Sequence, residues 1–412
     1  MICLCTLFTL FACSATSGGY TRLNAVAEST FSLEHLQNET YDSAYRDFSY
    51  RFFRTVATTE KENLCISPLS AYMAFSLCFY GSNGITAEEF SATFGLTKEQ
   101  AAEYCESLYA SFMQRQYRDE KTRVNLANSV WLDERVTSYV KEEYLRGATD
   151  HFNAPIFKCD FSDQRTLDYV NDWCADNTDG LIRKIIDRFD DNQIMALINA
   201  LLVEASWIEQ YLPSSIVSDT FRNAEGTDAN ADYLCRKITS CYLSSDAKAF
   251  RMPLRDGFSF VGILPDQGIS ITDYCATLTA EKIASLLAKP SYDYDVYTRI
   301  PEFSADFELD LRATMQSMGM TSAFRAETAD FTSMTSIPHV YVGTAKQKTH
   351  FELDKNGIKA AAVTYIAINE KSVMPIDRPK INIYLDRPFI YLLVENETNL
   401  PLFIGRINNL GE

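Results

Sequence analysis

The sequence predicts an α+β fold in which helices dominate the front half of the chain and strands the back half. Ser67-Pro68 begins a predicted helix with a capping hydroxyl and a proline at the first helical position, and Gly81 ends it. Residues 194–203 form an apolar run that is typical of a central strand covered on both faces. Because strands and helices do not alternate steadily, this pattern favours α+β over a βαβ fold.

The remaining predicted elements follow from hydrophobic periodicity and turn signals. Helices are predicted over residues 97–113 and 167–176, and strands over residues 258–264, 349–354, 381–384, 389–395 and 400–407. A length of 412 residues would on average make two or three domains. Residues 31–410 contain no repeat, low-complexity tract or linker, so we expect one large domain over residues 31–412.

Composition excludes several classes of protein. Lys and Arg total 38 and Asp and Glu total 55, a net charge of −17, and no basic cluster is visible in the sequence, which argues against a nucleic-acid binder. No apolar run approaches the ~20 residues that cross a bilayer. The four histidines lie outside helical ligand spacing of one another. We therefore expect no metal site, no cofactor and no catalytic triad, so the protein is not predicted to be an enzyme.

The amino-terminal segment is predicted to be an export signal. Residues 1–12 are almost wholly apolar, too short to span a membrane but suited to a signal peptide. Residues 10–13 resemble a bacterial lipoprotein signal, in which Cys13 would be lipidated as the first mature residue. Residues 13–30 would then be a flexible tether. We expect an extracellular protein, either secreted or lipid-anchored at the cell surface.

The cysteines give little support for a disulfide framework. The chain has eleven, three of them among the first thirteen residues, and no Cys-x-x-Cys pair. Cys65 and Cys78 lie in apolar runs and are predicted to be buried. Cys235 and Cys241 could either bridge a short loop or remain free thiols.

A hairpin is predicted near the end of the chain. The alternating strand over residues 349–354 is followed by Asn356-Gly357, a strong hairpin turn signal. The next twelve residues alternate again, and one face is nearly all apolar. That face consists of Ile358, Ala360, Ala362, Thr364, Ile366 and Ile368. Residues 370–379 have charges, two prolines and no period, which predicts an exposed loop.

Ordered motifs along the chain resemble the serpin family. They are Asn63-Leu64-Cys65-Ile66-Ser67-Pro68-Leu69-Ser70, Asn171-x-Trp173 with Thr178-x-Gly180-x-Ile182, Leu197-Ile198-Asn199-Ala200, Phe258-Ser259-Phe260 with Ile263-Leu264-Pro265, Ala329-Asp330-Phe331, Arg387-Pro388-Phe389 and Pro401-Leu402-Phe403-Ile404-Gly405. The resemblance covers roughly residues 45–410. Three further features are closer to bacterial serpins than to animal ones, namely Gln347-Lys348-Thr349, Lys359 and residues 384–389.

The resemblance implies a serpin fold, with helices packed on a large mixed sheet, two smaller sheets and an exposed reactive-centre loop at about residues 355–380. The hinge of that loop would be Gly357, Ile358, Lys359, Ala360, Ala361 and Ala362. After cleavage, residues 358–369 would insert as a new strand beside residues 194–203. Asn199 and Gln347 would belong to the region where the sheet opens.

The resemblance also implies an activity, the irreversible inhibition of serine proteases through a covalent acyl-enzyme complex. In inhibitory serpins the cleaved residue usually lies fourteen positions after the hinge glycine, which gives Lys371-Ser372. A basic residue before a small one would suit trypsin-like proteases. We expect a monomer whose partner is such a protease.

Three departures from the family pattern keep alternatives open. Ile358 replaces the usual Thr or Ser, Lys359 replaces an acidic residue, and residues 372–389 are a longer stretch than usual. A bulky Ile358 would delay insertion rather than abolish it. The alternatives are a non-inhibitory serpin that binds or carries another molecule, or an inhibitor of elastase-like, chymotrypsin-like or cysteine proteases cleaved nearer Tyr365 or Ile368.

Overall fold

The computed structural model describes residues 16–17, 19–24, 37–116, 122–189, 193–343, 345–358 and 378–411. These residues form α-helices, β-sheets and short 3-10 turns. The helices are α1 (Glu39–Thr59), α2 (Pro68–Gly81), α3 (Gly84–Phe94), α4 (Lys98–Gln116), α5 (Glu142–Asp150), α6 (Gln164–Asn177), α7 (Ile271–Ala276), α8 (Ala280–Leu287) and α9 (Leu311–Ser317).

The strands form three sheets. The largest has the order β1 (Thr16–Ser17), β2 (Tyr20–Arg22), β5 (Ile156–Cys159), β4 (Thr122–Asp133), β6 (Met195–Ser206), β15 (Gly357–Ile358), β14 (Lys346–Asp354) and β13 (Phe303–Asp310). The second has the order β3 (Leu64–Ile66), β18 (Pro401–Ile407), β17 (Phe389–Glu395), β11 (Phe258–Pro265), β10 (Ala247–Pro253) and β9 (Tyr242–Leu243). The third has the order β16 (Lys380–Tyr384), β12 (Asp295–Pro301), β8 (Asp228–Ile238) and β7 (Ile216–Arg222).

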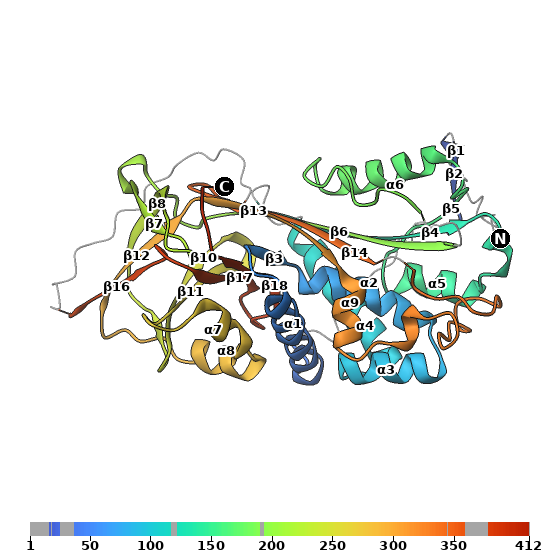
Figure 1. Cartoon of the computed structure of the whole chain (residues 1–412), viewed down its shortest axis with the longest axis horizontal. Coiled ribbons are helices and arrows are strands. Elements are labelled where there is room, and N and C mark those ends of the chain that lie inside the picture. Colours follow the sequence, from blue (N-terminus) through green and yellow to red (C-terminus); the bar gives the residue numbers. More distant parts are fainter. Residues whose placement is uncertain are drawn as a thin grey trace, which may run out of the picture.

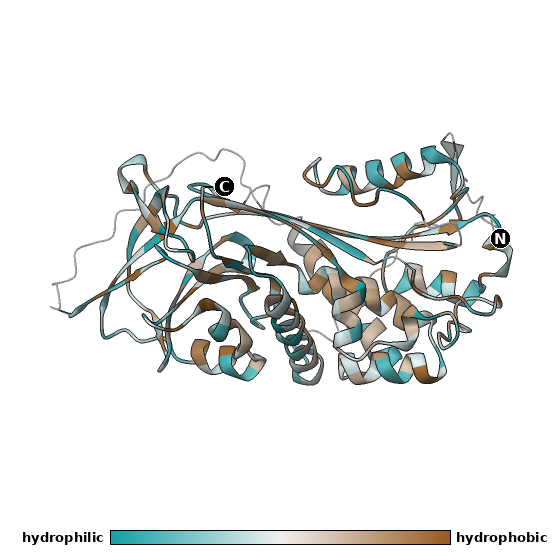
Figure 2. Cartoon of the chain, in the orientation of Figure 1, coloured by the Kyte–Doolittle hydropathy of each residue, from teal (hydrophilic) through white to brown (hydrophobic). Residues whose placement is uncertain are grey.

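The long strands of the largest sheet run across the molecule and separate two layers of helices. Figure 1 shows α2, α4 and α5 on one side of this sheet and α6 on the other, with the third sheet at one end. The main core fills the side of the sheet that α2, α4 and α5 cover. A smaller core lies under α6, where Leu167 and Val170 pack with Trp131 and Ile198 of the sheet. In Figure 2 the hydrophobic residues gather along α2 and the strands of the second sheet. The predicted α+β class is confirmed.

The predicted elements are present, with small shifts at their ends. The Ser67 hydroxyl accepts a hydrogen bond from the Ser70 amide at 3.1 Å and so caps α2, which is almost wholly buried. The front half also contains strands that the sequence analysis did not predict, above all β4 (Thr122–Asp133). Along β4, buried and half-buried residues alternate from Thr122 to Asn128, so the signal for a strand was available in its first half.

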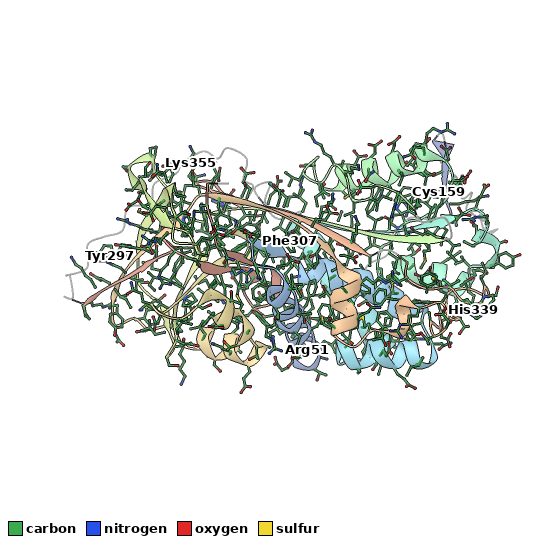
Figure 3. All side chains as sticks on the ribbon, viewed as in Figure 1. Arg51, Cys159, Tyr297, Phe307, His339 and Lys355 are labelled. Atoms are coloured by element: carbon green, nitrogen blue, oxygen red, sulfur yellow. The ribbon has the colours of Figure 1, made fainter. Side chains whose placement is uncertain are left out.

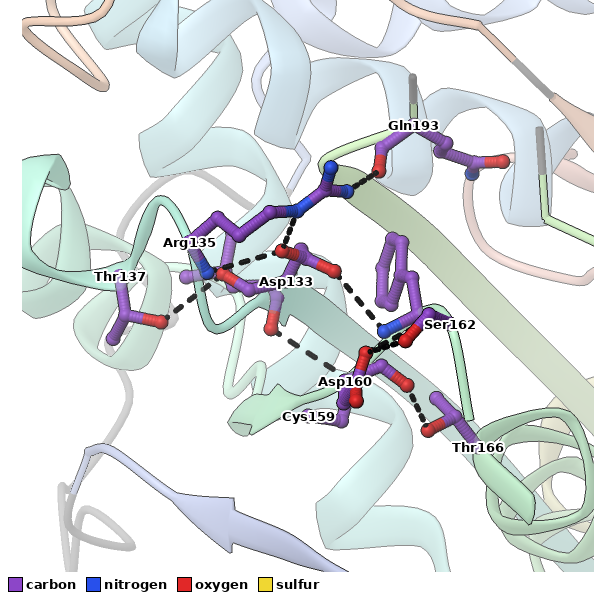
Figure 4. A network of polar contacts seen from close by, with 10 residues as sticks. Asp133, Arg135, Thr137, Cys159, Asp160, Ser162, Thr166 and Gln193 are labelled. Carbon is purple, nitrogen blue, oxygen red and sulfur yellow. Dashed lines mark hydrogen bonds and ion pairs between the residues drawn. The ribbon is translucent and has the colours of Figure 1, made fainter. Parts of the chain in front are cut away.

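A polar network fixes the end of β4 to the start of α6 (Figure 4). Asp133, almost fully buried, accepts hydrogen bonds from the Phe161 amide at 3.0 Å and from the amide and Nε of Arg135. Arg135 also donates to the Gln193 carbonyl, just before β6 begins. The network therefore holds β4, the start of β6 and the segment before α6 together at one edge of the molecule.

The cysteines of the described residues are all free thiols, including Cys235 and Cys241, and Cys65 and Cys78 are buried as predicted. Burial raises the pKa of the Cys65 thiol to about 12, so it stays protonated at neutral pH. Of the helices in the described ranges, none has the length and apolar character that crossing a bilayer demands.

Candidate functional site

The predicted hinge begins inside the largest sheet. Gly357 and Ile358 form β15, which pairs antiparallel with β14 on one side and with β6 on the other. Ile358 lies opposite Leu353 and Ala205 and is 2% exposed in the main core. The expectation that the intact protein keeps the whole segment outside the sheet is therefore wrong for these two residues. Full burial of an isoleucine side chain contributes about 1.5–3 kcal/mol, a gain that a smaller polar residue would not provide.

A tight turn delivers the chain into this position. The Asp354 carboxylate accepts hydrogen bonds from the amides of Asn356 (2.7 Å) and Gly357 (3.2 Å). Trp207, directly after β6, donates from Nε1 to the Asp354 carbonyl at 2.9 Å. Gly357 has φ of 145°, and a Cβ atom there would lie 2.2 Å from the Ala205 carbonyl oxygen. Only glycine fits, so this residue sets where the segment enters the sheet.

Beyond Ile358, β6 and β14 continue on the two sides of the line that β15 begins. β6 is paired with β4 along its other edge, and β14 is paired with β13. Within the described residues of β6 and β14, no ladder joins the two strands directly. A cavity lies between them, lined by Leu201 and Val203 of β6, Phe351 of β14 and Ile358. The described residues of β6 and β14 therefore enclose a small cavity next to the end of β15.

The segment that links α6 to β6 covers this first cavity. Thr178, Leu181 and Ile182 contribute to its lining. The Thr178 hydroxyl accepts a hydrogen bond from the Ile182 amide at 3.1 Å, which holds the link in place. Sequence reasoning singled out Thr178 and Ile182 only as family-like positions and gave them no role.

A second cavity lies farther along the same two strands. It is lined by Leu197 and Asn199 of β6, by Ala345 and Gln347 at the start of β14, and by residues of α2. The residues of α2 are Ser70, Ala71, Ala74, Phe75 and Cys78. The structure thus brings the two predicted sheet-opening residues, Asn199 and Gln347, to opposite sides of one cavity.

Both predicted sheet-opening residues are hydrogen-bonded to the start of α2. The Asn199 carboxamide accepts from the Ser70 hydroxyl and donates to Asn128 Oδ1 at 2.6 Å. Gln347 Nε2 donates to the Ser67 carbonyl at 2.8 Å, and Gln347 Oε1 accepts from the Ser67 amide at 3.1 Å. Each strand edge is therefore tied to α2. Sequence reasoning missed Asn128, which is 71 residues from Asn199 in the chain.

Ion pairs on the opposite face of the sheet join β14 to β13. Lys348 Nζ lies 2.9 Å and Lys346 Nζ 3.1 Å from the Glu308 carboxylate. The hydrogen bond from Lys348 holds the pKa of Glu308 below its usual value. Such exposed pairs contribute only about 0–1 kcal/mol each to the free energy of unfolding. Both of these pairs link β14 to β13, and neither links β14 to β6.

The other predicted site residues lie outside the described residues. These are the lipidation candidate Cys13, the hinge residues Lys359, Ala360, Ala361 and Ala362, the strand residues Thr364, Ile366 and Ile368, and the predicted reactive bond Lys371-Ser372. Their roles stay predictions.

Comparison with known proteins decides the family. A family model described as Serpin (serine protease inhibitor) matches residues 43–410. The chain belongs to the serpin family. Human serpin I2 is 24% identical to this serpin over 372 residues, covering 88% of this chain and 90% of its own. A serpin-like protein of Thermococcus kodakarensis is 23% identical over 380 residues, covering 92% and 87%.

Solved structures agree with this assignment. The native state of tengpin, a thermophilic serpin, superposes with a TM-score of 0.80 at 30% identity, covering 94% of this chain and 97% of tengpin. Thyroxine-binding globulin in complex with thyroxine has a TM-score of 0.76 at 21% identity, covering 90% and 99%, and shares the fold alone. Serpins are mostly protease inhibitors, but the fold also occurs in proteins that bind a small molecule.

Proposed function

We propose that this serpin is an exported, irreversible inhibitor of serine proteases that acts as a suicide substrate. The observation that carries the proposal is the position of Gly357 and Ile358, which begin a strand between β6 and β14. The facing edges of those two strands have no direct ladder within their described residues. β15 has begun a strand between β6 and β14, and these two strands are not paired with each other farther along their described residues. An intact chain in this state is poised to lengthen β15 once its loop is cut.

The register of β15 defines where each further residue would go. Each step forward along the loop moves one residue back along both β6 and β14. Ala360 would then lie opposite Val203 and Phe351, and Thr364 opposite Asn199 and Gln347. Every second residue would share the core side with Ile358, so the apolar face predicted from the sequence would be the one buried.

The covalent step would use the chemistry of the protease and no catalytic group of the inhibitor. The protease serine Oγ would attack the Lys371 carbonyl, and the peptide bond to Ser372 would break. The new ester would join Lys371 to the protease, while the nitrogen of Ser372 would leave as a free amine after taking up a proton. Release of the protease would require water to hydrolyse that ester.

Strand insertion would prevent that hydrolysis. A strand of about fourteen residues at ~3.3 Å each would carry the bound protease roughly 45–50 Å along the sheet. There the active site of the protease would be distorted, so the ester would persist. The gain would come from burying Ile366 and Ile368, about 1.5–3 kcal/mol each, and from new ladder hydrogen bonds of about 0.5–1.5 kcal/mol each.

The unusual Ile358 favours inhibition over the non-inhibitory alternative. A bulky residue at this position would slow the entry of the strand if it had to pass between β6 and β14 after cleavage. In the structure Ile358 is already buried. The residues to enter next would be Lys359, whose side chain would alternate away from the core, and the small residues Ala360, Ala361 and Ala362. They would add little steric resistance.

Incubation with a trypsin-like protease tests the proposal. We expect a covalent complex that survives SDS, and mass spectrometry should find the released carboxyl-terminal peptide beginning at Ser372. Lys371→Ala should abolish the complex with trypsin, whereas the neighbouring Ser372→Ala should keep it. Quantitative cleavage without a complex would contradict the proposal and indicate a carrier. A complex cleaved near Tyr365 or Ile368 would move the reactive bond and point to elastase-like or chymotrypsin-like targets.

A further inference from the structure

Two lysine ammonium groups flank one tyrosine ring on the outer face of the third sheet. Lys237 Nζ of β8 lies 5.9 Å, and Lys380 Nζ of β16 5.8 Å, from the ring centroid of Tyr297 on β12. Tyr297 is paired with Lys237 on one side and with Asn382 on the other. Arg378 lies two residues before Lys380. Figure 3 shows Tyr297 at one end of the molecule.

The cations of this cluster are only partly neutralised. Lys237 Nζ lies 2.7 Å from Asp295 Oδ2. That hydrogen bond raises the pKa of Lys237, and the nearby charge of Arg378 acts against the rise. Over the part of the chain that the structure describes, neither Arg378 nor Lys380 forms an ion pair. Two unpaired cations beside a third are notable in a chain whose net charge is −17.

The cluster lies within reach of a protease bound at the predicted reactive bond. Lys371 and Arg378 are seven residues apart, which at full extension is at most about 25 Å. A protease domain of about 220 residues is roughly 40 Å across. A protease docked on Lys371 would therefore overhang the surface formed by Lys237, Arg378 and Lys380.

We propose that Lys237, Arg378 and Lys380 form a docking surface for an acidic face of the target protease, an inference that rests on the proposed function. The net charge of the whole chain repels an acidic protein at long range. At about 0.1 M salt, charges are screened beyond about 10 Å, so the local cations decide the final approach. Complementary charge at such a surface raises the rate of association and selects partners.

The test compares charge reversal at this surface with a matched reversal elsewhere. Arg378→Glu with Lys380→Glu is the test variant. Lys141→Glu with Arg146→Glu is the control, because both residues are exposed, lie at α5 near the opposite end of the molecule, and change the net charge equally (Figure 1). Binding is measured to an anionic and to a cationic trypsin whose active-site serine is replaced by alanine. Both variants should unfold at the temperature of the unmodified protein.

We expect the test variant to bind anionic trypsin at least about tenfold more weakly at low salt, with no loss for cationic trypsin. The difference should disappear at 1 M salt, and the control variant should change little. Equal losses in the two variants, or equal losses with the two trypsins, would overturn the inference. So would loss of dextran sulfate binding with unchanged trypsin binding, which would assign the surface to a polyanion.

The same experiment separates this inference from the proposed function. If inactive anionic trypsin binds through the cluster but active trypsin forms no SDS-stable complex, the docking surface holds and the inhibitory function is wrong. If complexes form at equal rates with the test and control variants, the function holds and the docking surface is wrong. Absence of binding to either inactive trypsin would overturn both.

Discussion

Cutting the Lys371-Ser372 bond is expected to raise the midpoint of thermal unfolding by on the order of 10–20 °C. Insertion would add about ten residues to the sheet beside β6 and β14, with net ladder hydrogen bonds of about 0.5–1.5 kcal/mol each and two buried isoleucines. Together these contribute on the order of 10–15 kcal/mol. For a chain of this size the midpoint of thermal unfolding rises by roughly 1 °C for each kcal/mol added to the free energy of unfolding, because the unfolding entropy scales with chain length.

Limited trypsin digestion followed by differential scanning calorimetry measures this shift. The cut product should first be checked by mass spectrometry, because a second cut elsewhere would lower stability. A sample cut by a glutamate-specific protease only after Glu28 or Glu34, outside the family match at residues 43–410, serves as the control and should not be stabilised. An unchanged midpoint after cleavage at Lys371 would contradict insertion.

Ala360→Pro is expected to convert the inhibitor into a substrate. In the register of β15, residue 360 is the second to enter after Ile358 and would lie opposite Val203 and Phe351. Proline has no amide hydrogen to donate and is excluded from central strands. A cost of about 3 kcal/mol at this step would shift the balance between trapping and release by roughly 100-fold.

The number of inhibitor molecules consumed per protease inactivated measures that balance. It should be near one for the unmodified protein and should rise steeply for Ala360→Pro, while the rate of cleavage stays similar. Ile376→Pro is the matched control, because it lies beyond the predicted reactive bond and would not enter the sheet. Trapping by Ala360→Pro that equals trapping by the control would refute the mechanism.

Local sequence signals predicted the elements that depend on local physics. The Ser67 cap, the apolar run of β6 and the turn at Asn356-Gly357 were each legible because neighbouring residues determine them. The strand β4 was missed although its first half alternates regularly, because the front half of the chain was interpreted as helical. The family resemblance supplied the division of the strands into one large and two smaller sheets, which periodicity alone does not contain.

The parts of the site that the sequence did not reveal depend on contacts between distant residues. Ile358 was expected outside the sheet, but its place is decided by Ala205, about 150 residues earlier. The hydrogen bond between Asn199 and Asn128 and the approach of Lys237 and Lys380 to Tyr297 likewise join distant segments. Such convergence follows from the topology of the sheets and leaves no local pattern in the sequence.

Hydrogen exchange of the loop-cleaved protein, compared with the intact one, tests the strand vacancy between β6 and β14 most directly. Cleavage at Lys371 should slow exchange strongly in peptides covering residues 359–368 and along the facing edges of β6 and β14. If residues 359–368 exchange as fast as an unfolded chain after cleavage, while β6 and β14 become protected by pairing with each other, strand insertion does not occur.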